Sequence, residues 1–207
     1  MNRWMFILVF FTTQWMFSQE MSKRTVKLMG SRFEITVVSS STETATKYIE
    51  EAISEISRIE SLISSWDPKS ETSLINRNAG IKPVVIAAEL FDLIKRSVAI
   101  SKLTNGAFDI SYASLDKIWK FDGSMSKMPS KEAINKSVAH VGFQNIILDD
   151  KNSSVFLKHK GMKIGFGAIG KGYAADKAKA LLISKEVTAG IINASGDMNS
   201  WGHHPDG

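Results

Sequence analysis

A glycine-rich segment has the residue types and spacing of a loop that binds phosphate. It reads Gly165-Phe166-Gly167-Ala168-Ile169-Gly170-Lys171-Gly172-Tyr173. Glycines let backbone N–H groups approach phosphate oxygens, and a helix that begins at such a loop adds the positive end of its dipole. The segment therefore predicts a phosphate or pyrophosphate site. The same glycines are also typical of a helix start that packs closely against a sheet.

Two nucleotide-binding fingerprints match this segment only in part. Gly165–Gly170 fits G-x-G-x-x-G, which in a dinucleotide-binding fold requires an acidic residue about 20 positions later at a strand end. Glu186 comes before the next expected strand, and Asp197 comes late. The pattern G-x-x-x-x-G-K ends at Lys171, but a P-loop then needs Ser or Thr, and Gly172 follows. An NAD-dependent oxidoreductase is therefore the less favoured hypothesis.

Five segments taken together make the chain similar to a known family. Read in order, they resemble the ApbE family of FAD:protein FMN transferases, and the resemblance covers nearly all of residues 25–207. The segments are Met29-Gly30-Ser31-Arg32-Phe33, Trp66-Asp67-Pro68-Lys69-Ser70-Glu71 with Asn76, Gly106-Ala107-Phe108-Asp109, Ala168-Ile169-Gly170-Lys171-Gly172-Tyr173-Ala174-Ala175-Asp176, and Asn193-Ala194-Ser195-Gly196-Asp197.

The resemblance implies a Mg²⁺-dependent reaction that starts from FAD. Members bind FAD in a cleft, cleave its pyrophosphate, transfer FMN to a threonine hydroxyl of a target protein and release AMP. The implied target is a membrane or exported redox subunit. The chemistry agrees with the motif, because Mg²⁺, a lysine and glycine-loop amides stabilise the negative charge that builds up on the oxygens. An FAD pyrophosphatase and a non-catalytic flavin-binding module are the alternatives.

The resemblance also assigns site residues. It implies cofactor contacts by six residues: Met29, Trp66, Ala107, Phe108, Asp109 and Lys171. Trp66 stands where tyrosine is usual and would stack on the isoalloxazine or adenine ring, since both side chains offer a flat π face. The Ala168 backbone carbonyl is implied as a Mg²⁺ ligand, an oxygen ligand of the kind that a hard cation prefers. No catalytic base is assigned.

The sequence departs from the family pattern in three places. Gly165 stands where aspartate is common, and Ser195 stands where glycine is common. The family chain continues well past Gly207 and supplies there a metal-binding aspartate and a nearby threonine or serine. The sequence therefore resembles the N-terminal portion of a family member, and without those ligands we expect weak Mg²⁺ binding.

The elements that position these residues are expected to form an α+β fold. Apolar residues recur at helical spacing from Ala45 to Ile63, after a capping-box pattern at Ser40–Glu43, and again over 87–103 with Ile100 or Leu103 inward. A third helix follows Gly172 and runs to Lys185. Short strands are expected over 25–28, 33–38, 145–148, 155–157 and 190–194, with a hairpin through Asp149–Asn152. Local hairpins favour mixed or antiparallel sheets with flanking helices over strict βαβ alternation.

The N-terminus predicts export. Arg3 is followed by the apolar run Trp4–Phe11 and then by polar residues, which is typical of a signal peptide. The run is shorter than the about 20 apolar residues of a comfortable membrane span. We therefore expect residues 1–19 to be a signal peptide or an N-terminal anchor, and residues 20–207 to be one FAD-binding domain. The protein would be periplasmic or attached to the outer face of the cytoplasmic membrane.

Composition excludes several other classes of protein. The chain has 207 residues, 43% of them hydrophobic and 23% charged, which is ordinary for a globular domain. It has no cysteine, which excludes disulfides, thiolate metal sites and a cysteine nucleophile. The net charge of +5 is spread along the chain, whereas nucleic-acid binding needs a clustered basic face. No nucleic-acid partner is expected.

Overall fold

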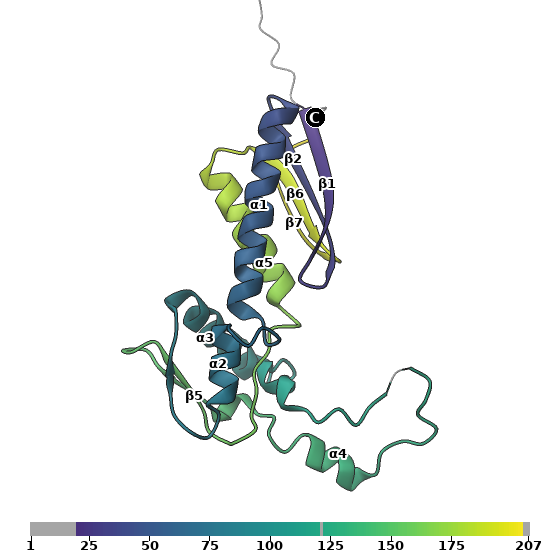
Figure 1. Ribbon diagram of the computed structural model, residues 1–207, viewed down its shortest axis with the longest axis vertical. Coiled ribbons are helices and arrows are strands. Elements are labelled where there is room, and N and C mark those ends of the chain that lie inside the picture. The colour runs from purple at the N-terminus through teal and green to yellow at the C-terminus, as the bar shows by residue number, and fades with distance from the viewer. Residues whose placement is uncertain (1–19, 121, 205–207) are drawn as a thin grey trace, which may run out of the picture.

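The protein has two halves stacked along its long axis, as the computed structural model shows (Figure 1). The structure describes residues 20–120 and 122–204. In the upper half two long helices cover one face of a four-stranded sheet, and in the lower half short helices lie beside a small three-stranded sheet. Two connections, residues 64–70 and 158–169, run between the halves.

The upper sheet is antiparallel throughout, in the order β1-β2-β6-β7. Tight turns with positive φ close its two hairpins, Met29 (50°) with Gly30 (69°) and Ser195 (57°) with Gly196 (106°). Turns of this kind match the right-handed twist of paired strands. The strands are β1 Glu20–Leu28, β2 Ser31–Ser39, β6 Ala189–Ala194 and β7 Asp197–Trp201.

Helix α1 spans Thr42–Ile63, and its N-cap is Ser41, one residue later than the predicted cap Ser40. The Ser41 hydroxyl accepts the Thr44 N–H at 3.2 Å, so the predicted capping box at Ser40–Glu43 was wrong. Its apolar stripe is buried as predicted, at Ala45, Ile49, Ala52, Ile56, Ile59 and Ile63.

Helix α5, Gly170–Ser184, packs along α1 with small residues. Its buried face includes Gly170, Ala174, Ala175 and Ala178, which bring the two helix axes close together. Both helices also contact the upper sheet, α1 over β1 and β2 and α5 over β6 and β7. The core of the upper half therefore lies between this helix pair and the sheet.

The lower half consists of short elements. Its antiparallel sheet has the order β3-β5-β4, and the predicted hairpin at Asp149–Asn152 is confirmed as the β4–β5 connection. An arm over residues 115–120 and 122–142 carries α4 and projects away from the rest of the molecule (Figure 1). The elements are α2 Glu71–Arg77, β3 Val84–Val85, α3 Ala88–Leu103, 3₁₀ helix η1 Ile110–Ser114, α4 Lys131–Ser137, 3₁₀ helix η2 Phe143–Asn145, β4 Ile146–Asp149 and β5 Ser154–Leu157.

The α+β prediction is confirmed, and the dinucleotide-binding alternative is overturned. That fold needs a strand leading into the glycine loop and a parallel sheet. Residues 158–164 form no strand, and all pairings among the described strands are antiparallel. The predicted signal peptide or anchor, residues 1–19, lies outside the described residues. Among the helices of the described part, none has the length and apolar character needed to cross a membrane.

Candidate functional site

Two adjoining pockets lie where the connections between the halves meet. The larger, about 860 Å³, faces the lower half, and the smaller, about 500 Å³, faces the upper half. They share three residues, Ser65, Trp66 and Gly167, so Trp66 and Gly167 stand on the boundary between them. The two volumes lie within or near the range of small-molecule sites.

Trp66 is held out into solvent by the end of α1. The Ser64 hydroxyl accepts the N–H groups of Trp66 and Asp67 at 3.2 and 3.1 Å, which turns the chain sharply after the helix. The Trp66 side chain is 84% exposed. The Lys117 ammonium lies 5.4 Å from the centre of its ring, a cation–π distance. An exposed aromatic ring between two pockets is placed to stack on a planar ligand.

The smaller pocket brings together Met29 and Lys171, two of the residues predicted to contact the cofactor. The Met29 N–H donates to the Glu60 carboxylate at 3.0 Å, which ties the β1–β2 turn to the last turn of α1. The Lys171 ammonium lies 3.7 Å from the Asp197 carboxylate, at the start of β7. This pocket is thus built from the β1–β2 turn, the end of α1 and the start of α5.

The glycines before α5 are required for close packing. A Cβ on residue 165 would lie 3.1 Å from the Ala113 Cβ, and one on residue 170 would lie 2.7 Å from the Ile63 Cδ1. The structure therefore supports close packing as one reason for the glycines. Packing does not account for the whole loop, because Ala168 is exposed.

The start of α5 is also open to an anion. Its N-cap, Ile169, makes no side-chain capping bond, and its first turn carries no acidic residue. Gly170 and Lys171 of this turn line the smaller pocket. The Gly170 N–H donates to the Phe166 carbonyl at 2.6 Å, whereas the N–H groups of Lys171 and Gly172 make no such bond within the described residues. These two N–H groups, the positive end of the helix dipole and the lysine side chain together favour a negatively charged ligand.

The larger pocket is positively charged. Arg77, Lys117 and Lys163 line it, against a single carboxylate from Asp116. Tyr112 stands beside Trp66 on its wall, and its hydroxyl accepts the Gly167 N–H at 3.1 Å. An aromatic, cationic pocket suits a planar ligand that carries phosphate.

Three predicted cofactor contacts lie outside both pockets. Ala107, Phe108 and Asp109 precede η1, and none of them lines either pocket. The Asp109 carboxylate caps η1 by accepting from the Ser111 N–H at 2.8 Å, and it also accepts from the Phe143 N–H at 2.8 Å. The structure therefore gives Asp109 a role in local folding, and its role in FAD binding stays a prediction.

The predicted metal ligand is the backbone carbonyl of Ala168. Ala168 is exposed on the turn before α5, and no hydrogen bond to its carbonyl is present within residues 20–120 and 122–204. Over the same residues no group of three or more His, Cys, Asp or Glu could hold a metal ion. A single carbonyl does not make a site for Mg²⁺, which requires near-octahedral oxygen coordination.

Sequence reasoning missed Tyr112, Lys117 and Glu60. Tyr112 and Lys117 lie in a mixed aromatic stretch with no periodicity, and their partners Gly167 and Trp66 are distant in sequence. Glu60 lies on the long amphipathic helix among other charged residues. Nothing in the local pattern separates these three from ordinary surface residues.

Comparisons with a family model and with known proteins point to the same family. The sequence model of the ApbE family matches residues 29–207. A Klebsiella pneumoniae protein named FAD:protein FMN transferase is 33% identical over 147 residues, 71% of this chain and 46% of that protein. A Chlamydia pneumoniae protein of the same name is 25% identical over 150 residues, 72% of this chain and 48% of that protein. This chain thus spans about half the length of these relatives.

Solved structures agree with the sequence comparison. The crystal structure of the ApbE protein from Thermotoga maritima superimposes with a TM-score of 0.77 at 31% identity, over 87% of this chain and 59% of that chain. The Pseudomonas stutzeri flavinyl transferase ApbE gives a TM-score of 0.78 at 22% identity, over 93% of this chain and 62% of that chain, and this likeness supports the fold alone.

Proposed function

The chain belongs to the ApbE family, and from that premise we propose that it takes part in transferring FMN from FAD to a hydroxyl group of an acceptor protein. The observation that carries the proposal is the pair of adjoining pockets with Trp66 on their boundary and the open start of α5 beside them. FAD has two planar ring systems joined by a pyrophosphate. The two pockets would each take one ring system, and the start of α5 beside them would take the pyrophosphate.

The proposed reaction is a phosphoryl-type transfer with threonine as the acceptor. The acceptor oxygen bonds to the phosphorus of the FMN part, the bond from that phosphorus to the bridging oxygen breaks, and AMP leaves with that oxygen. The hydroxyl proton passes to a base. The Lys171 ammonium and the N–H groups of Lys171 and Gly172 would stabilise the charge that develops on the phosphate oxygens. Trp66 would hold a ring of FAD by stacking.

We include Mg²⁺ dependence in the proposal because the segment Ala168–Asp176 resembles the family motif. When bound, Mg²⁺ would neutralise charge on the pyrophosphate. The described residues contribute the Ala168 carbonyl and no acidic cluster, so they do not fit a metal site by themselves.

That same observation favours a second candidate, a non-catalytic flavin-binding module. Such a module would bind FAD at the same pockets without cleaving it. An FAD pyrophosphatase would instead release AMP and free FMN without a protein acceptor.

We also propose that the protein acts outside the cytoplasm, on an exported or membrane redox protein. The support is the basic residue and apolar run at Arg3–Phe11. A protease-protection assay on intact spheroplasts would place the chain on either side of the membrane.

One experiment separates the enzymatic candidates. The full chain is incubated with FAD, Mg²⁺ and a threonine-containing acceptor, and the products are resolved by chromatography and intact-protein mass spectrometry. Transfer predicts AMP together with an acceptor heavier by the mass of FMN less one water. AMP with free FMN would identify a pyrophosphatase. Bound FAD without AMP would identify a binding module and reject transfer by this chain.

A further inference from the structure

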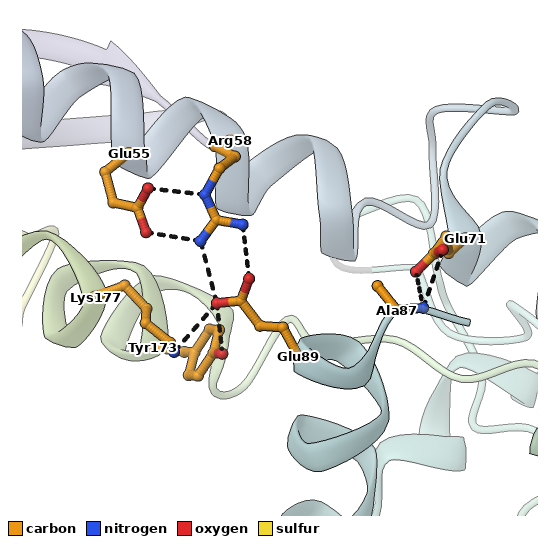
Figure 2. A network of polar contacts seen from close by, with 7 residues as sticks. All are labelled: Glu55, Arg58, Glu71, Ala87, Glu89, Tyr173 and Lys177. Carbon is orange, nitrogen blue, oxygen red and sulfur yellow. Dashed lines mark hydrogen bonds and ion pairs between the residues drawn. The ribbon is translucent and has the colours of Figure 1, made fainter. Parts of the chain in front are cut away.

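A cluster of charged side chains joins the start of α3 to both long helices of the upper half. Figure 2 shows Glu89, in the first turn of α3, facing Arg58 on α1 and Tyr173 and Lys177 on α5. Arg58 Nη1 and Nη2 donate to its carboxylate at 2.6 and 3.1 Å. The Tyr173 hydroxyl donates to it at 3.1 Å, and the Lys177 ammonium lies 3.2 Å away. One carboxylate therefore connects three helices.

The rest of the cluster fixes Arg58 in place. Glu55, one turn earlier on α1, accepts from Arg58 Nε at 2.8 Å and from Nη2 at 2.7 Å. Planar, bidentate pairs of this kind hold a guanidinium in one orientation. The hydrogen bonds that Arg58 donates to Glu55, and then those to Glu89, raise the pKa of Arg58. The bonds that Glu89 accepts from Arg58 chiefly lower the pKa of Glu89 to about 2. Arg58 and Glu89 are therefore both charged throughout the physiological pH range.

A second carboxylate joins the same end of α3 to α2. The Ala87 N–H, at the N-cap of α3, donates to both oxygens of Glu71 at 3.1 and 3.0 Å (Figure 2). Ala87 has no side-chain cap of its own. Glu71 is the first residue of α2, so α2 and α3 are tied at their N-terminal ends.

These contacts connect the walls of both pockets. The ends of α1 and α5 that Glu89 joins contribute Glu60, Ile63, Gly170 and Lys171 to the smaller pocket. The α2 helix that Glu71 joins contributes Ser73, Asn76 and Arg77 to the larger pocket. The first turn of α3 lines neither pocket, yet it is bonded to the helices that form both.

We infer that Glu89 is a positioning residue for the FAD site, holding the upper and lower pocket walls at the spacing that lets one dinucleotide contact both. The inference rests on the proposed function. It assigns Glu89 no contact with FAD, because its effect passes through α1, α5 and α3. Small errors in the spacing of binding groups reduce affinity even where each group is intact.

The test compares Glu89→Gln with Lys95→Gln in the full chain. Lys95 lies on the same helix and pairs with Asp150 at 2.5 Å on the exposed surface, so its variant controls for loss of an α3 ion pair. The dissociation constant of FAD is measured by flavin fluorescence at a temperature where each variant is fully folded. Glu89→Gln is expected to raise the dissociation constant about tenfold, and Glu89→Asp is expected to raise it less. Lys95→Gln is expected to change the dissociation constant by less than about twofold.

Hydrogen exchange supplies a readout that does not depend on FAD. In Glu89→Gln, amides of residues 64–70 and 165–171 should exchange faster, while those of β2 and β6 stay protected. The inference is overturned if Glu89→Gln lowers the melting temperature but leaves both the FAD affinity and the exchange of these loops unchanged. Failure of the unmodified chain to bind FAD would reject the proposed function instead, and loop exchange would still decide the role of Glu89.

Discussion

The Tyr112 hydroxyl accepts the Gly167 N–H at 3.1 Å, and a Cβ on residue 167 would lie 2.4 Å from that same oxygen. The two residues are 55 positions apart and meet at the boundary of the two pockets. The contact requires glycine at position 167 for space, and it leaves the Tyr112 ring on the pocket wall. Close packing against Tyr112 therefore explains why residue 167 is glycine, and the same contact shapes the site.

Gly167→Ala should displace the Tyr112 ring and weaken FAD binding about tenfold. The phenol is 40% exposed and can swing outward, so we expect little loss of stability. Tyr112→Phe removes the oxygen that the new Cβ would strike. Gly167→Ala should consequently cost much less affinity in the Tyr112→Phe background, a coupling of about 1 kcal/mol in a double-mutant cycle. Additive effects in fluorescence titrations of the four proteins would refute this account of the contact.

Two glycines of α5, two residues apart, should respond oppositely to alanine. Gly170→Ala places a Cβ 2.7 Å from the Ile63 Cδ1 in the buried α1–α5 interface, and should lower the free energy of unfolding by about 1–3 kcal/mol. Gly172→Ala meets nothing closer than 4.0 Å and should raise it by about 0.5–1 kcal/mol through helix propensity. Urea denaturation measures both. Adding Ile63→Val should recover part of the Gly170→Ala loss, and no recovery would argue against the packing explanation.

Glu89 should make stability depend on pH in acid. Hydrogen bonds from Arg58 chiefly lower its pKa from 4.5 to about 2. A carboxylate with a lowered pKa in the folded state stabilises the protein above its unfolded pKa, and this contribution is lost as pH falls toward the folded value. At neutral pH the free energy of unfolding of the unmodified chain should exceed that of Glu89→Gln by an amount on the order of 1–2 kcal/mol, after allowance for solvent screening. This difference should shrink as the pH falls from 5 to 2. Urea titrations across this range would contradict the prediction if the difference stayed constant.

Trp66 should matter for binding and little for stability. Its side chain is 84% exposed, so Trp66→Ala should change the free energy of unfolding by less than about 0.5 kcal/mol. Stacking of a base on an aromatic residue contributes about 1–3 kcal/mol, so FAD affinity should fall about tenfold or more. Trp66→Tyr should retain most of the affinity. Leu103, 83% exposed and outside both pockets, provides a matched control in Leu103→Ala.

Helical periodicity predicted the long helices well, and its errors have a physical cause. It placed Ile100 or Leu103 inward on α3, but both are exposed. Ser97 and Ser101 are buried on that helix instead, because their hydroxyls donate to the Leu93 and Ser97 carbonyls at 2.7 and 3.0 Å. A pattern that counts only apolar residues cannot anticipate a polar side chain that satisfies its hydrogen bonds within its own helix.

Strand β7 was missed for a different reason. Three of its five residues, Asp197, Asn199 and Ser200, are polar, so apolar alternation gave no signal. The strand is defined by pairing with β6 across the Ser195–Gly196 turn, and by the Trp201 indole donating to the Val187 carbonyl at 2.9 Å. The Ser-Gly turn could have indicated the hairpin.

The site was predictable in part. Family resemblance named Met29, Trp66 and Lys171 as cofactor contacts, and the structure places all three on the smaller pocket. Their contact with FAD stays a prediction. It could not identify Tyr112 or Glu89, because their roles come from contacts made only after distant segments have folded together. Such contacts leave no trace in local spacing.

The most direct test of the account is a fluorescence titration of FAD with the full chain and with Trp66→Ala, in the presence and absence of Mg²⁺. The account predicts saturable binding at one site per chain, with Trp66→Ala weaker by about tenfold or more. Absence of saturable binding by the folded, unmodified chain would contradict the assignment of the two pockets as an FAD site.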